Sequence, residues 1–383
     1  MQSSRLMRLM AAAAALQAAA PAIAETRVSV RSSEYDERPL REAPVDGSDE
    51  RYTVRKQQFE LSHERDESDA LSLRLTSEWM SGSSPWFNVP GETGGVQQIM
   101  SGATIDDRRA ELIAGWTRRN EGRSRTLQLS ASHEDDYRSL ALGLSFERPL
   151  NDTYTLGYGA SVSDDTIEPT DAAQFGRVER EDKRTLSAHV SLAQILDRAS
   201  VVQWGVSVNH GSGYLSDPYK LFFAGGPTLP DSRPEQRTQA SAFTRYRRDV
   251  TSLSGVLHAD VRVATDNWGL QSLALEGAWY QSLGDDWRLV PQLRYYEQSA
   301  ASFYAPFSAS IASAGRFHSS DFRLGAFGAL SAALDVRWQS GDLAVVFGYE
   351  HYRGDEPLFF NADNDDPAWL TFGQWHAGFD YRF

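Results

Sequence analysis

The sequence predicts an all-β protein, a transmembrane antiparallel up-and-down β-barrel of about 16 strands, with roughly 14 to 18 possible. Three observations predict this fold. Apolar and polar residues alternate over many segments of about ten residues, as in strands with one face in lipid and one in water. The connections between these segments are alternately short and long, and the chain ends in an aromatic strand closed by Phe383. Periodicity decides the fold class because only alternate residues of such a barrel face lipid, which keeps the mean hydropathy low.

The first 24 residues have the pattern of a secretory signal peptide. Arg5 and Arg8 precede a short apolar run, and Ala22-Ile23-Ala24 offers small residues at a cleavage site. The run is too short to span a bilayer, which takes about 20 apolar residues. We therefore expect residues 1–24 to be a signal peptide and residues 25–383 to form a single barrel domain in the bacterial outer membrane.

The alternation is clearest in residues 185–209, where two strands are joined by a short turn around Asp197. Leu186, Val190, Trp204 and Val206 belong to the apolar set, and polar residues or glycine fall between its members. The pattern recurs in residues 127–131, 140–146, 154–162, 253–263, 273–279, 287–295, 322–338 and 343–349. Residues 28–35 and 52–61 are weakly patterned, which is why about 14 strands remain possible.

The connections set the strand count. Short polar turns are expected near residues 64–67, 120–122, 149–152, 197–199, 249–251, 284–286 and 340–342. Longer connections are expected at residues 38–50, 82–104, 164–180, 213–235, 300–319 and 354–369, with two short ones at 133–137 and 265–268. Outer-membrane barrels have short periplasmic turns and longer external loops. Seven turns imply seven hairpins and two terminal strands, so about sixteen strands with both termini in the periplasm.

The last strand carries the most specific signal. Trp375, Phe379, Tyr381 and Phe383 lie on one face of it, with polar residues or glycine between them. An aromatic C-terminus preceded by aromatics two and four residues back resembles the signal that the barrel-assembly machinery reads. We therefore assign Phe379, Tyr381 and Phe383 as an assembly signal and expect that machinery as a partner.

Composition narrows the partners. The chain has 38 Lys and Arg against 52 Asp and Glu, a net charge of −14, and without residues 1–24 the charge is −16 because Arg5 and Arg8 are lost. An acidic exported chain argues against nucleic acid and against anionic membrane surfaces as partners. As an outer-membrane barrel, the chain is expected to contact outer-membrane lipid and lipopolysaccharide. The sequence contains no Cys, so no disulfide supports the fold.

If the apolar set faces lipid, the other set lines the lumen. The charged residues that we assign to it are Arg74, Glu78, Arg109, Glu111, Arg245, Arg247, His258, Asp260, Arg262, Glu276, Arg288, Arg294, Arg323, Asp335, Arg337, Glu350, Asp380 and Arg382. Both signs occur, so charges can pair across the lumen, and we expect a porin-like channel for small polar solutes with a transverse field. The alternative is that the same side chains fill the lumen and brace the wall.

Three loop segments contain candidate functional residues. Asp217-Pro218-Tyr219-Lys220 precedes a proline-rich stretch and is expected mainly to set turns, with a folded-in plug or a docking surface as the alternative. Asp363, Asp365 and Asp366 are weak candidates for a calcium or magnesium site. His210 and Ser212 suggest a hydrolase, but no third partner stands at a readable spacing. We expect no enzyme activity and no cofactor.

Several strings resemble the bacterial domain-of-unknown-function family 3570. They are SGATIDDR at 101–108, LSDPYK at 215–220, DNWG at 266–269, RYYEQSAASFY at 294–304 and SSDFRL at 319–324. The family consists of expected outer-membrane barrels without an established activity or catalytic residues. The resemblance implies a genetic neighbourhood with a small lipoprotein, a thioredoxin-like protein and a flavin transferase. It therefore implies, as an alternative function, a docking scaffold for a periplasmic redox protein.

Overall fold

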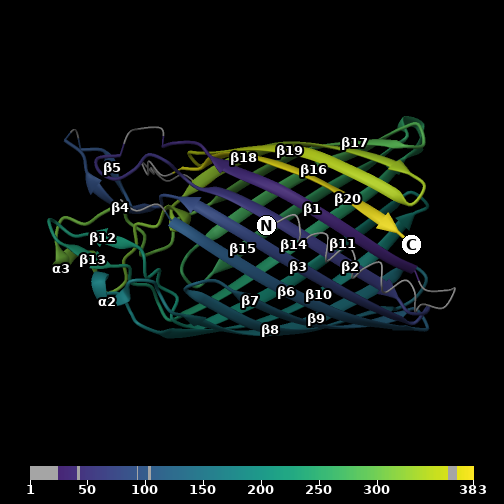
Figure 1. Ribbon diagram of the computed structural model, residues 1–383, viewed down its shortest axis with the longest axis horizontal. Helices are drawn as coiled ribbons and strands as arrows, with labels where there is room; N and C mark the ends of the chain where they lie inside the picture. Colours follow the sequence, from purple (N-terminus) through teal and green to yellow (C-terminus); the bar gives the residue numbers. More distant parts are fainter. Residues whose placement is uncertain (1–24, 41–43, 93, 102–104, 361–368) are drawn as a thin grey trace, which may run out of the picture.

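The computed structural model describes residues 25–40, 44–92, 94–101, 105–360 and 369–383. Within these residues, sixteen strands form one closed antiparallel barrel (Figure 1). In sheet order they are β1 (Glu25–Glu37), β2 (Thr53–Glu64), β3 (Asp69–Gly82), β6 (Ile105–Asn120), β7 (Arg123–His133), β8 (Tyr137–Pro149), β9 (Tyr154–Ile167), β10 (Glu181–Asp197), β11 (Ser200–Gly213), β14 (Gln236–Val250), β15 (Gly255–Asp266), β16 (Gln271–Leu283), β17 (Trp287–Gln298), β18 (Phe327–Ser340), β19 (Leu343–Asp355) and β20 (Thr371–Arg382).

The first and last strands close the barrel. β1 pairs with β20 from Arg27 opposite Arg382 to Glu37 opposite Phe372, and its other edge pairs with β2. Closure leaves no open edge, so every barrel strand pairs with a neighbour on both sides, as a bilayer requires. The predicted count of about sixteen is confirmed, and the weak pattern of the first two strands does not reduce it.

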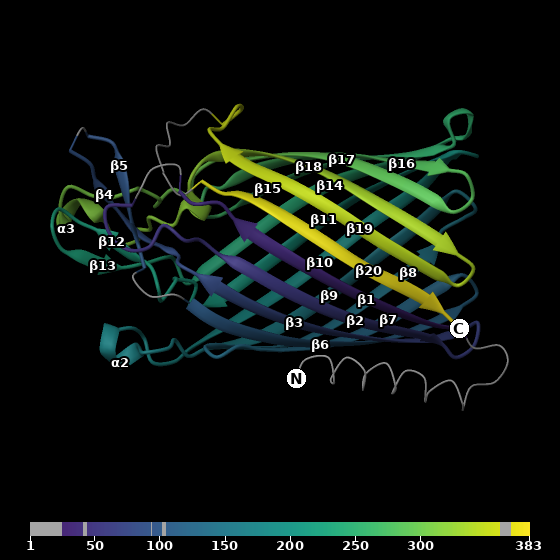
Figure 2. The same ribbon diagram turned by 45° about the horizontal axis from the view of Figure 1, so that its top comes forward.

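Short turns lie at one end of the barrel and the longer connections at the other (Figure 2). The N-terminal end of β1 and the C-terminal end of β20 both lie at the turn end. The β6–β7 turn shows the local cause of a tight hairpin, because Glu121 and Gly122 both have positive φ, at 50° and 73°. Two-residue hairpin turns of this type need that conformation at both positions, and glycine adopts it without strain.

The connections at the loop end are numbered in chain order. They are loop 1 (38–52), loop 2 (83–104), loop 3 (134–136), loop 4 (168–180), loop 5 (214–235), loop 6 (267–270), loop 7 (299–326) and loop 8 (356–370). Short elements within them are β4 (Pro85–Pro90), β5 (Val96–Met100), α2 (Ala172–Phe175), β12 (Leu221–Phe223), β13 (Thr228–Pro230), α3 (Ile311–Ala314) and η2 (Phe322–Leu324). The short helix η1 (Thr251–Leu253) lies in a turn instead.

The two faces of the wall differ in polarity as the alternation predicts. Leu142 and Val206 are 41% and 53% exposed on the outward face, although both are strongly apolar. Their strand neighbours Gly143 and Ser207 face the other way, into the barrel. An apolar exterior over a polar interior is the arrangement of a transmembrane barrel. Among the described residues, no helix is long and apolar enough to cross a membrane.

One predicted strand begins later than expected. The alternation from residue 322 to 338 suggested a continuous strand, but β18 starts at Phe327. Residues 322–324 form the helix η2 instead, because the Asp321 carboxylate accepts the backbone N–H of Arg323 at 3.1 Å and caps it. Arg323 therefore lies in loop 7, and its assignment to the lumen wall was wrong.

Candidate functional site

The inward face of the barrel collects the other charged residues assigned to the lumen. The pairing register relates these seventeen positions around the wall, and all of them lie on the face opposite the exposed apolar set. For example, Asp260 stands between Arg245 on β14 and Glu276 on β16, and Glu276 stands opposite Arg294 on β17. The charged residues on this face are therefore neighbours in the sheet.

These charges pair along the wall. Asp380 on β20 accepts from Arg31 on β1 at 2.6 Å and from Arg337 on β18 at 3.2 Å. Arg109 on β6 lies 3.2 Å from Glu78 on the adjacent strand and 2.9 Å from Glu111 on its own.

Within the described strands, every ion pair joins residues of the same strand, of adjacent strands or of strands one apart. Ion pairs across the lumen are absent from these strands. The physical reason is width, because a barrel of about sixteen strands leaves an aqueous interior that side chains do not bridge.

Most of the lumen charge lies on one side of the barrel. The inward positions of β7 to β11 are mostly Ser, Gly, Thr and Ala, and we call this surface the small-residue wall. On β8 and β9 its members are Ser139, Ala141, Gly143, Ser145, Gly157, Gly159, Ser161 and Ser163. Charged residues there, such as Glu147 and Asp165, lie toward the strand ends. The lumen therefore has a charged wall from β14 through β20 and β1 to β6, facing a neutral wall of short side chains.

Three loops meet over the barrel mouth. Loops 2, 5 and 7 leave the wall at points separated by six, four and six strands around the sheet. They nevertheless touch: Lys220 of loop 5 donates to the Pro85 carbonyl of loop 2, and the rings of Phe222 in loop 5 and His318 in loop 7 lie 5.0 Å apart. Because the loops start at separate parts of the rim, these contacts lie across the mouth.

We call the described residues of loops 2, 5 and 7 the loop cap. Figures 1 and 2 show β4, β5, β12, β13 and α3 beyond the ends of the barrel strands. Backbone pairing reinforces the side-chain contacts, since Ser232 pairs with His318 and Ala224 with Ser308. The cap is thus a folded unit over the mouth.

Buried ion pairs hold the cap together. Arg233 of loop 5 lies 2.7 Å from Asp231 and 2.9 Å from Asp321 of loop 7. The side chains of both acids are 1% exposed and that of Arg233 is 11% exposed. Burial alone would raise the pKa of Asp321, but Arg323, Lys220 and Arg233 hold that pKa well below its usual range. Burial raises the pKa of Asp231, against the opposing effect of Arg233.

The Asp217-Pro218-Tyr219-Lys220 motif has a wider role than setting a turn. Asp217 accepts from Arg323 of loop 7 at 2.8 Å, as well as from the backbone N–H of Tyr219 at 3.0 Å. The Tyr219 hydroxyl donates to Asp136 of loop 3 and accepts the Thr170 N–H of loop 4 at 3.0 Å. The motif thus ties loop 5 to loops 2, 3, 4 and 7, an arrangement that residue types alone did not reveal.

Other candidates stand apart from this arrangement. His210 and Ser212 lie on the outward face of β11, and the His210 ring is within hydrogen-bond distance of the Thr238 hydroxyl, at 2.8 Å. Asp363, Asp365 and Asp366 lie outside the described residues. A carboxylate group that the sequence did not single out is formed by Asp107, Glu134 and Asp136, whose nearest oxygens all lie within 4.8 Å of one another. Oxygen clusters of this kind are able to hold hard divalent cations.

A closed barrel with an apolar exterior and a polar, charged interior defines the class of outer-membrane β-barrel proteins. The chain belongs to the family described as "Protein of unknown function (DUF3570)", whose model matches residues 5–358. No curated protein matches the sequence.

Among solved structures, the chain is similar to a "Bacterial polysaccharide outer membrane secretin", at 10% identity over 94% of this chain and 98% of that chain, with a TM-score of 0.49. It is also similar to OccK5 (OpdH) of Pseudomonas aeruginosa, at 7% identity over 94% and 98% of the two chains, with a TM-score of 0.45. OmpT of Vibrio cholerae matches at 8% identity over 94% and 97%, also with a TM-score of 0.45.

Proposed function

We propose that this protein is a channel for small polar solutes, integral to the outer membrane, with its turn end in the periplasm and its loop cap outside. The observation that carries the proposal is the two-sided lumen, in which a charged wall faces the small-residue wall inside a closed barrel of sixteen strands. Short side chains on one side leave room for water, and fixed charges on the other orient polar solutes.

A lumen packed solid for structural reasons would need large side chains on both walls. Gly143 instead occupies an inward position on β8, where an added Cβ meets nothing closer than 3.7 Å, and Ser161 is exposed on β9 although its strand is part of a closed wall. These positions support a hydrated interior. The loop cap then controls access from the loop end, because its contacts cross the mouth.

The test is conductance of the refolded barrel in a planar bilayer, with heat-modifiable gel migration as the folding check. We expect stepwise conductance. Gly143→Phe places a ring in the lumen, where a Cβ meets only ordinary contacts at 3.7 Å or more, and should lower the unit conductance. Leu142→Phe on the outward face of the same strand is the matched control and should leave the conductance unchanged.

A folded barrel that stays electrically silent, also after proteolytic removal of the loop cap, would contradict the channel. That result would favour the alternative function, a docking scaffold for an envelope redox system. The scaffold predicts co-purification with a periplasmic or lipid-anchored redox protein from native membranes.

A further inference from the structure

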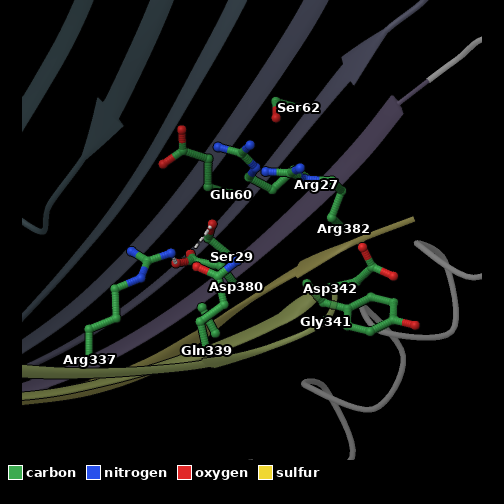
Figure 3. A pocket seen from close by; sticks show the side chains of 12 residues that line it. Arg27, Ser29, Glu60, Ser62, Arg337, Gln339, Gly341, Asp342, Asp380 and Arg382 are labelled. Atoms are coloured by element: carbon green, nitrogen blue, oxygen red, sulfur yellow. Dashed lines mark hydrogen bonds and ion pairs between the residues drawn. The ribbon is translucent and has the colours of Figure 1, made fainter. Parts of the chain in front are cut away.

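A charged cavity of about 250 Å³ opens into the lumen near the turn end (Figure 3). Its lining comes from β1, β2, β18, β19 and β20 and from the β18–β19 turn. Three guanidinium groups line it, those of Arg27, Arg337 and Arg382, together with the carboxylates of Glu60, Asp380 and Asp342. Figure 3 shows Arg337 on one side of Asp380, and Arg27 and Arg382 on the other.

The carboxylates around the cavity are already engaged. Asp380 accepts from Ser29 at 2.7 Å and is shared by Arg31 and Arg337. Glu60 lies 3.2 Å from Arg74, which stands opposite it on β3. A carboxylate that serves two arginines, or that serves an arginine outside the cavity, leaves donor capacity on the guanidinium groups that line it.

The carboxylate at the other side of the cavity is also shared between two arginines. Glu25 is shared by Arg27 at 3.5 Å and Arg382 at 3.0 Å. Counting both sides, five arginines share three carboxylates: Arg27, Arg31, Arg74, Arg337 and Arg382 against Glu25, Glu60 and Asp380. Asp342, the remaining acid of the lining, makes no ion pair within the described residues, so the positive excess is one charge.

A sixth arginine increases the positive charge. Arg288 on β17 stands directly opposite Arg337, and no carboxylate of the described residues lies within ion-pair distance of it. Like charges directly opposite each other on neighbouring strands are destabilising unless something neutralises them. Asp380 offsets this repulsion only in part, because it is shared between Arg337 and Arg31, so an anion beside Arg337 would weaken the repulsion further.

We propose that this cavity is a binding site for a small oxyanion, a carboxylate or a phosphate, held by Arg337 together with Arg27 and Arg382. The inference rests on the proposed channel and names its solute class. Guanidinium groups present paired N–H donors that match the geometry of both anions and stay charged at every physiological pH. The cavity of about 250 Å³ is large enough for one such ion with part of its hydration.

The test is equilibrium dialysis of radiolabelled inorganic phosphate against the refolded full chain in detergent, with labelled succinate as the carboxylate probe. We expect saturable binding of at least one probe at low ionic strength. The double variant Arg27→Gln and Arg337→Gln should weaken that binding at least tenfold. Arg337→Lys keeps the charge but loses the paired donors, and should bind with intermediate affinity.

The matched control is Arg125→Gln with Arg248→Gln, two exposed arginines on the outward face near the turn end. It changes the net charge equally and should leave binding intact. Wild-type protein that binds neither probe, or a folded double variant that binds as tightly as wild type, would overturn the site. Neither binding result depends on conductance. A folded barrel that carries no current would therefore refute the channel without refuting the anion site. In a conducting barrel, the double variant should also shift the reversal potential toward cation preference.

Discussion

Replacing Arg233 with methionine tests whether the loop cap is held by its buried ion pairs. The substitution keeps most of the side-chain volume but removes the charge that joins Asp231 of loop 5 to Asp321 of loop 7. Removing one partner of a buried ion pair costs about 3–5 kcal/mol, because the other charge is left uncompensated. Asp321 keeps Arg323 at 2.6 Å, so we expect the lower end of that range, about 3 kcal/mol.

The cost falls on the cap, because Arg233 contacts no barrel strand through these pairs. A loss of about 3 kcal/mol raises the population of the opened cap about 100-fold. Hydrogen exchange with mass spectrometry measures the population of the opened cap. The reporters are the backbone amides of Ser232 and His318, which donate to each other's carbonyls at 3.0 and 2.8 Å. Peptides from β10 and β11 should keep their wild-type exchange.

The control is Arg316→Met, since Arg316 is an exposed arginine of loop 7 that stacks on Phe317 and makes no ion pair within the described residues. It should change cap exchange by less than threefold, as expected of an exposed position. If Arg233→Met protein exchanged its cap amides at the wild-type rate, the buried pairs would not be what holds the cap closed.

Three further predictions address pH, lipid exposure and assembly. Because the pKa of Asp321 is lowered in the folded cap, its contribution to stability is present above about pH 4 and is lost as the pH falls below about 4. Because the pKa of Asp231 is raised in the folded cap, its contribution to stability is lost as the pH rises above about 4. Cap protection, corrected for intrinsic exchange, should therefore peak near pH 4 in wild-type protein, and Asp231→Asn should remove the decline on the alkaline side; a flat profile would contradict this. Leu142→Arg on the outward face should lower the free energy of unfolding in lipid by about 2–4 kcal/mol, while Ser161→Arg on the inward face of the adjacent strand should cost under about 1 kcal/mol in urea titrations, and equal costs would place both residues in the same environment. Deleting Phe383, whose N–H donates to the Thr26 carbonyl at 2.8 Å, should reduce the heat-modifiable fraction in cells more than in refolding from urea, because it removes an assembly signal as well as one hydrogen bond.

The wall could be predicted from sequence because its cause is local. Each strand residue faces either lipid or water, so the alternation around Trp204 and Val206 reports orientation directly, and the turn at Gly122 marks where it reverses. The same rule placed seventeen of the eighteen lumen residues on the inward face. It failed for Arg323, where an Asp cap begins a helical turn in a segment that still alternates.

The cap could not be predicted in this way. Its stabilising contacts join residues far apart in sequence, 88 positions for Arg233 and Asp321 and 135 for Lys220 and Pro85. The sequence next to each of these four residues does not indicate its partner. The small-residue wall was visible as Ser and Gly at alternate positions of 139–163, but it acquires a meaning only when the register places those positions together, opposite the charged strands.

The two ends of the barrel differ in a way that bears on the direction of transport through the proposed channel. At the loop end, a solute meets the cap, in which Arg233 pairs with Asp231 and Asp321. The side chains of these two acids are 1% exposed, so they offer little charge to the solute. At the turn end, it meets the exposed guanidinium groups of Arg27 and Arg382, which share the single carboxylate of Glu25. Electrostatic capture therefore favours anions arriving from the turn end, whereas passage from the loop end depends on cap opening. The proposed channel should therefore respond to conditions at its two mouths independently, because no ion pair of the described residues links the cap network to the arginines of the cavity.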